Sequence, residues 1–240
     1  MPAGVGSEPR PLLSPHPQAV LRPEAHSHPL TPILRQVGPT SCPGRFNFHC
    51  HTIQSDGSLK PGDLASQAVR LGLEHLAITD HHSDQAFAEA EACFEAHAAE
   101  GKTVPRLWRG VEICALLEGC LVHVLALGFQ SPAPTLLPYL RGEAVVGPAL
   151  RAEAVVAAIQ EAGGLALLAH PARYRLPHPR LIAAAAGIGF DGAEAWYDYD
   201  RQGLWAPTPV VCDAIAADLR ERGLLLSCGT DTHGLELYGR

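Results

Sequence analysis

The chain has 240 residues, which is enough for one sizeable domain, and its formal net charge of −7 argues against a broad basic surface that would grip long nucleic acid. Its seven cysteines form no Cys-x-x-Cys pair, which indicates reduced thiols in a cytoplasmic protein rather than a disulfide framework. No apolar run approaches the ~20 residues that a membrane span needs, so we expect neither an anchor nor a membrane partner.

Residues 1–44 are rich in proline and show neither the alternation typical of strands nor the period of about 3.6 residues typical of helices. We interpret this segment as a disordered or loosely docked extension, and residues 45–240 as the folded domain. The extension contains His26 and His28, but no predicted strand fixes the geometry of the two rings. We therefore interpret them as a stray surface pair.

From residue 45 onward, predicted strands and helices alternate, which favours an α/β fold. The first strand begins at residue 45, and the others cover 75–79, 106–114, 119–129, 165–169, 190–195 and 223–228. Predicted helices cover 61–71, 83–101, 148–162, 181–186 and 209–222. Only a short loop separates the strands at 106–114 and 119–129, so we expect these two to pair as a hairpin.

Histidines and carboxylates stand where several of these strands have just ended. His49 and His51 would point to the same side of a strand, although such a pair taken alone could simply cap that strand. Because the carboxyl ends of parallel strands meet on one face, we expect the corresponding residues of other strands to join them. These residues are His81, His170, Asp231 and His233.

Glu112 and His123 on the intervening strands and Asp56 in the first loop would raise the number of nitrogen and oxygen donors to nine. One tetrahedral zinc ion takes only about three or four donors from protein. The pattern therefore indicates two or three divalent metal ions, with Glu112 bridging a pair of them. Mixed imidazole and carboxylate ligation suits Zn, Mn and Fe alike.

The motifs that contain these residues resemble those of the PHP (polymerase and histidinol phosphatase) domain family. They are His49-Cys-His51 with Asp56, Thr79-Asp80-His81, Gly110-Val-Glu112, His123, Ala169-His170-Pro171 and Thr230-Asp231-Thr-His233, in the order typical of that family. The resemblance implies a small stand-alone metal-dependent phosphoesterase, built as a distorted (βα)7 barrel with a trinuclear site at the carboxyl ends of its strands.

The resemblance also implies how the donors are shared among three ions. One ion would take His49, His51, Glu112 and Asp231; a second would take Glu112, His123 and His170; a third would take Asp56, His81 and His233. Two features depart from the family pattern. His82 stands where members often have Asp, and residues 131–162 replace an inserted helical subdomain, which suggests a more open cleft.

Clustered divalent ions favour hydrolysis of phosphate esters by a hydroxide that bridges the metals. We expect Glu112 and Asp231 to act through these ions and Arg173 to bind the substrate phosphate. The expected substrates are small phosphorylated metabolites, nucleotides or short oligonucleotides. Asp80 is interpreted as orienting His81.

Glu194 lies near the end of the predicted strand 190–195 and Asp198 follows that strand. We interpret both residues as an acidic rim of the cleft. Two other functions remain open. One is a histidinol-phosphate phosphatase. The other is a metal-stabilised binding module without catalysis, but the loss of ligands that would mark such a module is not seen among the nine predicted donors.

Overall fold

The structure is a computed structural model that describes residues 21–201 and 204–239. Seven strands form one sheet in chain order. The strands are β1 (Phe46–Asn47), β2 (His75–Ile78), β3 (Arg106–Leu117), β4 (Cys120–Leu127), β5 (Leu165–Leu168), β6 (Gly192–Trp196) and β7 (Leu225–Cys228).

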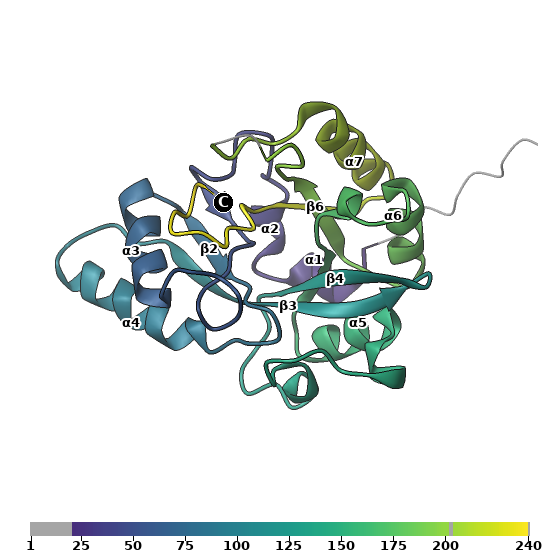
Figure 1. Ribbon diagram of the computed structural model, residues 1–240, viewed down its shortest axis with the longest axis horizontal. Coiled ribbons are helices and arrows are strands. Elements are labelled where there is room, and N and C mark those ends of the chain that lie inside the picture. Colours follow the sequence, from purple (N-terminus) through teal and green to yellow (C-terminus); the bar gives the residue numbers. More distant parts are fainter. Residues whose placement is uncertain (1–20, 202–203, 240) are drawn as a thin grey trace, which may run out of the picture.

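Helices connect and cover these strands. The α-helices are α1 (Pro23–Ser27), α2 (Thr31–Leu34), α3 (Pro61–Leu71), α4 (Ala86–Ala99), α5 (Ala152–Glu161), α6 (His178–Gly187) and α7 (Pro209–Glu221), with short 3-10 helices η1 (Leu137–Tyr139), η2 (Gly147–Leu150) and η3 (Pro171–Arg173). Helices α3 and α4 lie on one flank of the molecule and α6 and α7 on the other (Figure 1). Within the described ranges, no helix combines the length and apolar character that crossing a bilayer requires.

The sheet is parallel except around β4, which runs antiparallel to both β3 and β5. The predicted hairpin of β3 and β4 is confirmed. Its turn consists of Glu118 and Gly119, whose φ angles of 52° and 67° are both positive, as the two-residue turns that suit strand twist require. Glycine adopts this conformation at little cost, so the sequence supports the turn directly.

Backbone contacts between the two ends of the sheet nearly close it into a barrel. The N–H of Phe48 donates to the carbonyl of Cys228 at 3.0 Å, and beyond it the N–H of Asp231 donates to the carbonyl of His49 at 2.8 Å. Cys50 and Thr232 then form a parallel bridge. The result is a mixed α/β fold around a distorted, nearly closed barrel of seven strands, as expected.

Residues 21–44 differ from the expectation of a loose extension. They contain α1 and α2, bury Leu30 and Leu34 completely, and tie Arg22 to the buried Asp191 through a 2.8 Å ion pair. His28 is likewise buried against Trp108 instead of lying on the surface, whereas His26 is exposed. The folded domain thus begins before residue 45, and residues 1–20 lie outside the described part of the chain.

Candidate metal centre

A buried carboxylate, that of Glu112, lies at the centre of a group of histidines. Its Oε1 is 2.8 Å from Nδ1 of His123 and 3.2 Å from Nε2 of His170. Its Oε2 is 3.0 Å from Nε2 of His49 and 3.1 Å from Nε2 of His51. The two oxygens therefore face two separate pairs of imidazoles, which is the arrangement expected of a carboxylate that bridges two cations.

Glu112 and His123 lie within their strands, β3 and β4, whereas most of the other donors lie in loops that follow strand ends. Strand β3 continues past the end of β2 as one arm of the hairpin, and Glu112 forms a parallel bridge with His81 at that level. Strand β4 returns in the opposite direction and places His123 opposite Cys114. The hairpin thus brings two mid-strand side chains to the mouth of the barrel, which the rule about carboxyl ends of strands did not foresee.

Asp231 joins this group from the loop after β7. Its Oδ1 lies 3.3 Å from Nε2 of His49 and 3.1 Å from Nε2 of His51. Asp231 has a φ of 51° and His170 a φ of 28°. Such positive values are unfavourable for residues with a Cβ, and strain of this kind is concentrated at functional sites.

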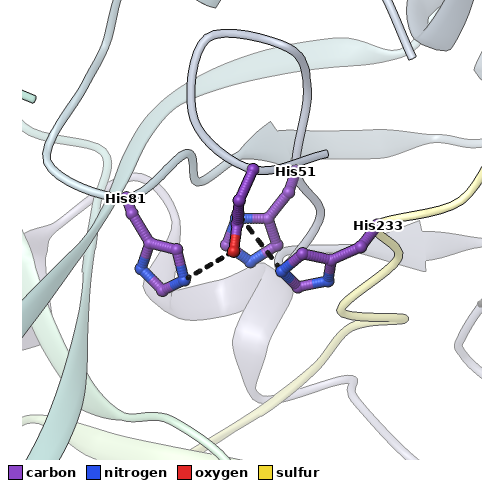
Figure 2. A group of neighbouring side chains, drawn as sticks. His51, His81 and His233 are labelled. Carbon is purple, nitrogen blue, oxygen red and sulfur yellow. Dashed lines mark ion pairs between the residues drawn. The ribbon is translucent and has the colours of Figure 1, made fainter. Parts of the chain in front are cut away.

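A second part of the centre surrounds Asp56, whose side chain is 57% exposed. Its carboxylate oxygens lie 3.3 Å from Nε2 of His233, 3.7 Å from Nδ1 of His51 and 3.8 Å from Nε2 of His81. Figure 2 shows the rings of His51, His81 and His233 gathered from three separate segments of the chain. His51 belongs to both parts of the centre, because its two nitrogens face different carboxylates.

In the part of the chain that the structure describes, three sets of donor atoms lie close enough together to hold a cation. They are His51, Asp56, His81 and His233; His49, His51, Glu112 and Asp231; and His81, Glu112 and His123. The first two sets contain the groupings implied by the family resemblance. The third has His81 in place of His170, although His170 still contacts the same oxygen of Glu112 as His123 does.

Nitrogens without hydrogen bonds support metal binding at these positions. Among the described residues, both ring nitrogens of His51 and Nδ1 of His81 and of His170 are buried and make no hydrogen bond of good geometry, although carboxylate oxygens lie 3.1 to 3.7 Å from the two nitrogens of His51. Leaving buried polar atoms unpaired is costly in proteins. Imidazoles and carboxylates are also ligands that Zn, Mn and Fe accept, so the donor set fits divalent cations.

The charges of the centre shift several pKa values. Burial alone would lower the pKa of His51, but Asp231 and Glu112 raise it to about 9. Burial likewise opposes protonation of His123, yet Cys114 and Glu112 raise its pKa to about 10. In the absence of cations these rings would therefore carry protons near neutral pH, and a bound cation would have to replace them.

His81 behaves differently from these two rings. Desolvation by burial, together with the positive charge of neighbouring histidines, lowers its pKa to about 4, against the opposing effect of Glu112. His81 is therefore neutral at physiological pH. A neutral imidazole can bind a cation without first losing a proton.

Glu194 supports the centre from inside the barrel, so its interpretation as part of an acidic rim is wrong. It lies within β6, is fully buried, places both oxygens 3.2 Å from Nδ1 of His49, and accepts the N–H of His170 at 2.9 Å. A carboxylate that holds the second nitrogen of a ligating histidine fixes its tautomer and orientation. One polar residue in the apolar strand Gly192–Trp196 was the available sequence signal.

Asp198 and Asp80 also have other roles than expected. Asp198 is buried, and its Oδ1 accepts the backbone N–H groups of Asp200 and Arg201. The Asp80 carboxylate accepts hydrogen bonds from the N–H and hydroxyl of Thr52 and the hydroxyl of Ser55, at 2.6 to 2.7 Å. Asp80 thus fixes the loop that carries Asp56 instead of orienting His81.

Arg173 lies beside the centre in η3, as its position after His170 suggested. Its Nη1 donates to Oδ2 of Asp231 at 2.8 Å and to the hydroxyl of Tyr197 at 2.9 Å, and Tyr197 donates to the same carboxylate oxygen at 2.6 Å. A cavity of about 290 Å³ opens here and is lined by Arg173, Arg201, Asp231 and His233. Neither Tyr197 nor Arg201 was expected from the sequence.

Known proteins are similar to this chain in sequence. The 5'-3' exoribonuclease of Haemophilus influenzae is 27% identical over 186 residues, which are 72% of this chain and 65% of that protein. The 3',5'-nucleoside bisphosphate phosphatase of Chromobacterium violaceum is 32% identical over 158 residues, or 64% of this chain and 44% of that protein. The chain therefore spans less than two thirds of the length of either relative.

A solved structure supports the fold. A protein from Bifidobacterium adolescentis, provisionally described as a metal-dependent phosphoesterase, superposes with a TM-score of 0.64 at 23% identity, covering 82% of this chain and 90% of its own. Residues 47–138, which carry His49 to His123 of the centre, match the model of the PHP domain. Together with the geometry of the histidine and carboxylate cluster, this match identifies a PHP domain in the part of the chain that includes residues 47–138.

Proposed function

We propose that this protein hydrolyses phosphate esters with two or three divalent ions, Zn, Mn or Fe, held by the nine donors around Glu112. The observation that carries the proposal is the bridging position of Glu112, whose two oxygens face the His49/His51 pair and the His123/His170 pair. Clustered divalent ions bound there would lower the pKa of water and neutralise charge on the phosphoryl oxygens. Such a site needs no nucleophilic side chain.

The protein's own residues would orient the substrate at this centre. Arg173 is held by Asp231 and Tyr197, and 37% of its side chain remains exposed toward solvent. A guanidinium can form two parallel hydrogen bonds with a phosphate group. Arg173 would therefore align the phosphate in the cavity beside Asp231 without having to change its place.

The expected substrates are small phosphorylated metabolites, nucleotides or short oligonucleotides. The cavity of about 290 Å³ is near the lower end of the volumes that bind small molecules, roughly 300 to 1,000 Å³. The names of the Haemophilus and Chromobacterium relatives, an exoribonuclease and a nucleoside bisphosphate phosphatase, favour nucleotides among these. The seven free cysteines are consistent with a cytoplasmic location, which is part of the proposal.

The proposed function is tested by a hydrolysis assay on protein whose bound metal ions have been counted beforehand. The substrates are an aryl phosphate, a nucleoside monophosphate, a phosphodiester and histidinol phosphate, each with added Mn²⁺ or Zn²⁺. We expect turnover of at least one of the first three, which is abolished by Asp231→Ala and kept by the surface control Glu74→Gln. Metal-loaded protein that hydrolyses none of the four would refute the proposal, and selective turnover of histidinol phosphate would favour the histidinol-phosphate phosphatase.

A binding module without catalysis makes a different prediction. It would be stabilised by metal just as strongly, since a ligand that binds only the folded state raises the melting temperature whatever its purpose. Melting with and without a chelator, compared with turnover on the same sample, separates the two. A large shift in melting temperature with no turnover would support the binding module.

A further inference from the structure

The hairpin of β3 and β4 packs with one of its two faces and presents the other to solvent (Figure 1). Alternate residues of a strand point to the same side, so Glu112, Cys114 and Leu116 share one face of β3. On β4, His123 lies opposite Cys114, and Leu121 lies nearer the turn. The other face is buried to within 3% exposure and consists of Ile113, Ala115, Leu117, Cys120, Val122 and Val124.

Two leucines on the open face are exposed although they are apolar. The exposed fraction is 40% for Leu116 and 55% for Leu121, and the two residues are directly paired across the hairpin. The Cβ atoms of such pairs are about 4.5 to 5.5 Å apart, so their side chains form one continuous apolar surface. Single exposed leucines are common, but an apolar surface that adjoins a polar site is typical of ligand binding. We call Leu116 and Leu121 the hairpin strip.

The hairpin strip continues the face that carries the metal-binding residues. His123, whose side chain is 27% exposed, lies on this face between Glu112 and the strip. A strand rises about 3.3 Å per residue, which places Leu121 about 7 Å from His123 and Leu116 about 13 Å from Glu112 along the hairpin. A ring joined to a metal-bound phosphate directly or through one sugar would reach the strip.

The strip and the cavity beside Asp231 would contact different parts of a substrate. Arg173, Arg201, Asp231 and His233 line that cavity, and none of them belongs to the hairpin. A phosphate aligned by Arg173 therefore leaves the hairpin face to the alcohol portion of the ester.

We infer that the hairpin strip binds an aromatic ring in the alcohol portion of the substrate and thereby selects aromatic over polar phosphate esters. This inference rests on the proposed function and specifies its substrate class. A flat ring covers both leucine side chains at once, and removing their apolar surface from water favours binding. The ring is the aryl group of an aryl phosphate or the base of a nucleotide, and leucine side chains offer no hydrogen bond that would distinguish one base from another.

The test compares each aromatic substrate with a polar ester that lacks the ring. The pairs are 2-naphthyl phosphate with glycerol 1-phosphate, and adenosine 5'-monophosphate with ribose 5-phosphate. Leu116→Asn and Leu121→Asn keep the approximate size of the side chain but make it polar. For each we expect kcat/KM to fall roughly 3- to 10-fold on the aromatic substrates, mainly through KM, and to stay within about twofold on the polar esters. Leu121→Met, which remains apolar, should keep the wild-type values.

Exposed apolar residues elsewhere provide matched controls. Val210→Thr changes an 84% exposed side chain on α7, and Ile53→Thr changes a 50% exposed side chain in the loop that carries Asp56. Neither should alter the preference for aromatic substrates. A loss in Ile53→Thr with unchanged asparagine variants would place the ring on the other side of the centre and overturn the inference.

The remaining outcomes are equally decisive. A loss on 2-naphthyl phosphate alone assigns the strip to an aryl group, and a loss on adenosine 5'-monophosphate alone assigns it to a base. Equal losses on all four substrates would show a disturbed metal centre instead of a ring site and would overturn the inference. A wild-type dimer in sedimentation that Leu121→Asn abolishes would assign the strip to contact between two copies of the chain and overturn it as well.

Binding measurements keep this inference separate from the proposed function. Calorimetry on the metal-loaded protein compares naphthylmethylphosphonate with methylphosphonate, neither of which has an ester bond to hydrolyse. We expect the naphthyl compound to bind at least about fivefold more tightly, and the double variant of Leu116→Asn and Leu121→Asn to lose this preference. If wild-type protein shows the preference but hydrolyses nothing, the proposed function fails and the ring site stands. If it hydrolyses phosphate esters without the preference, the ring site fails and the proposed function stands.

Discussion

Replacing Glu194 by glutamine tests the claim that the barrel interior positions the metal-binding histidines. Both carboxylate oxygens lie 3.2 Å from Nδ1 of His49, and one of them also accepts the N–H of His170 at 2.9 Å. Glutamine has the same shape but presents one oxygen and one NH₂ group. The NH₂ group would face either the ring N–H of His49 or the backbone N–H of His170, two donors that the carboxylate now satisfies.

The expected cost follows from this mismatch. His49 would change tautomer or turn, and its Nε2 would no longer be directed toward Glu112 as a free acceptor. Disturbing such a supporting carboxylate weakens metal binding roughly 10- to 100-fold, which corresponds to about 1.4 to 2.8 kcal/mol because each tenfold change is about 1.4 kcal/mol. The pKa of His49 should also fall, since burial already lowers it and Glu194 is one of the carboxylates that raise it.

Competition with a chelating dye measures the metal affinity of wild-type protein, of Glu194→Gln and of the control Glu74→Gln. Glu74 is an exposed glutamate on the surface. Circular dichroism and melting of the metal-free proteins check that each variant folds. Only Glu194→Gln should lose affinity. A folded Glu194→Gln protein whose affinity stays within about twofold of wild type would contradict the positioning role.

Three further predictions concern protons, backbone fit and the amino-terminal helices. The pKa of His51 is raised to about 9 and that of His123 to about 10. The protons on these two rings therefore stabilise the metal-free protein fully below about pH 6.5, the pKa of an unperturbed histidine, and this stabilisation is lost as the pH rises toward 10. Metal binding near pH 7 should therefore release two or more protons, and the metal affinity should rise with pH. Calorimetry in buffers of different ionisation enthalpy counts the released protons. Metal binding without proton release would be inconsistent with these pKa shifts. Gly229→Ala would place a Cβ 2.6 Å from the backbone nitrogen of His49, so we expect a destabilisation of about 1 to 3 kcal/mol in urea unfolding, together with weaker metal binding. Arg22→Ala leaves the buried carboxylate of Asp191 without its cation and should lower the free energy of unfolding by about 2 to 3 kcal/mol. An unchanged free energy of unfolding would mean that the Arg22–Asp191 ion pair does not hold α1 and α2 in place.

The donors around Glu112 could be predicted from the sequence because each stands in a short motif at a recognisable place. His49, His81, His170 and Asp231 lie two or three residues past the ends of strands, and strand ends converge in any parallel barrel. The hairpin that carries Glu112 could also be predicted, since only two residues separate its strands. What each donor binds remains a prediction.

The supporting residues could not be predicted in the same way. The sequence alone makes Glu194 a rim residue, because its burial depends on how β6 packs beside β5 and faces His49 inside the barrel, which no local pattern records. The same applies to residues 21–44, where Leu30 and Leu34 have the four-residue spacing of a helix but stand in a proline-rich stretch that hides it, and both are fully buried. Arg22 finds its partner Asp191 at a distance of 169 residues along the chain, so only the folded structure reveals the pair.

Anomalous diffraction from crystals of the metal-loaded protein, recorded at the absorption edges of Zn, Mn and Fe, would locate the ions themselves. We predict two or three ions, with Glu112 binding two of them through its separate oxygens and His51 near both parts of the centre. A single ion that leaves Glu112 unbound, or ions located away from these histidines, would contradict it.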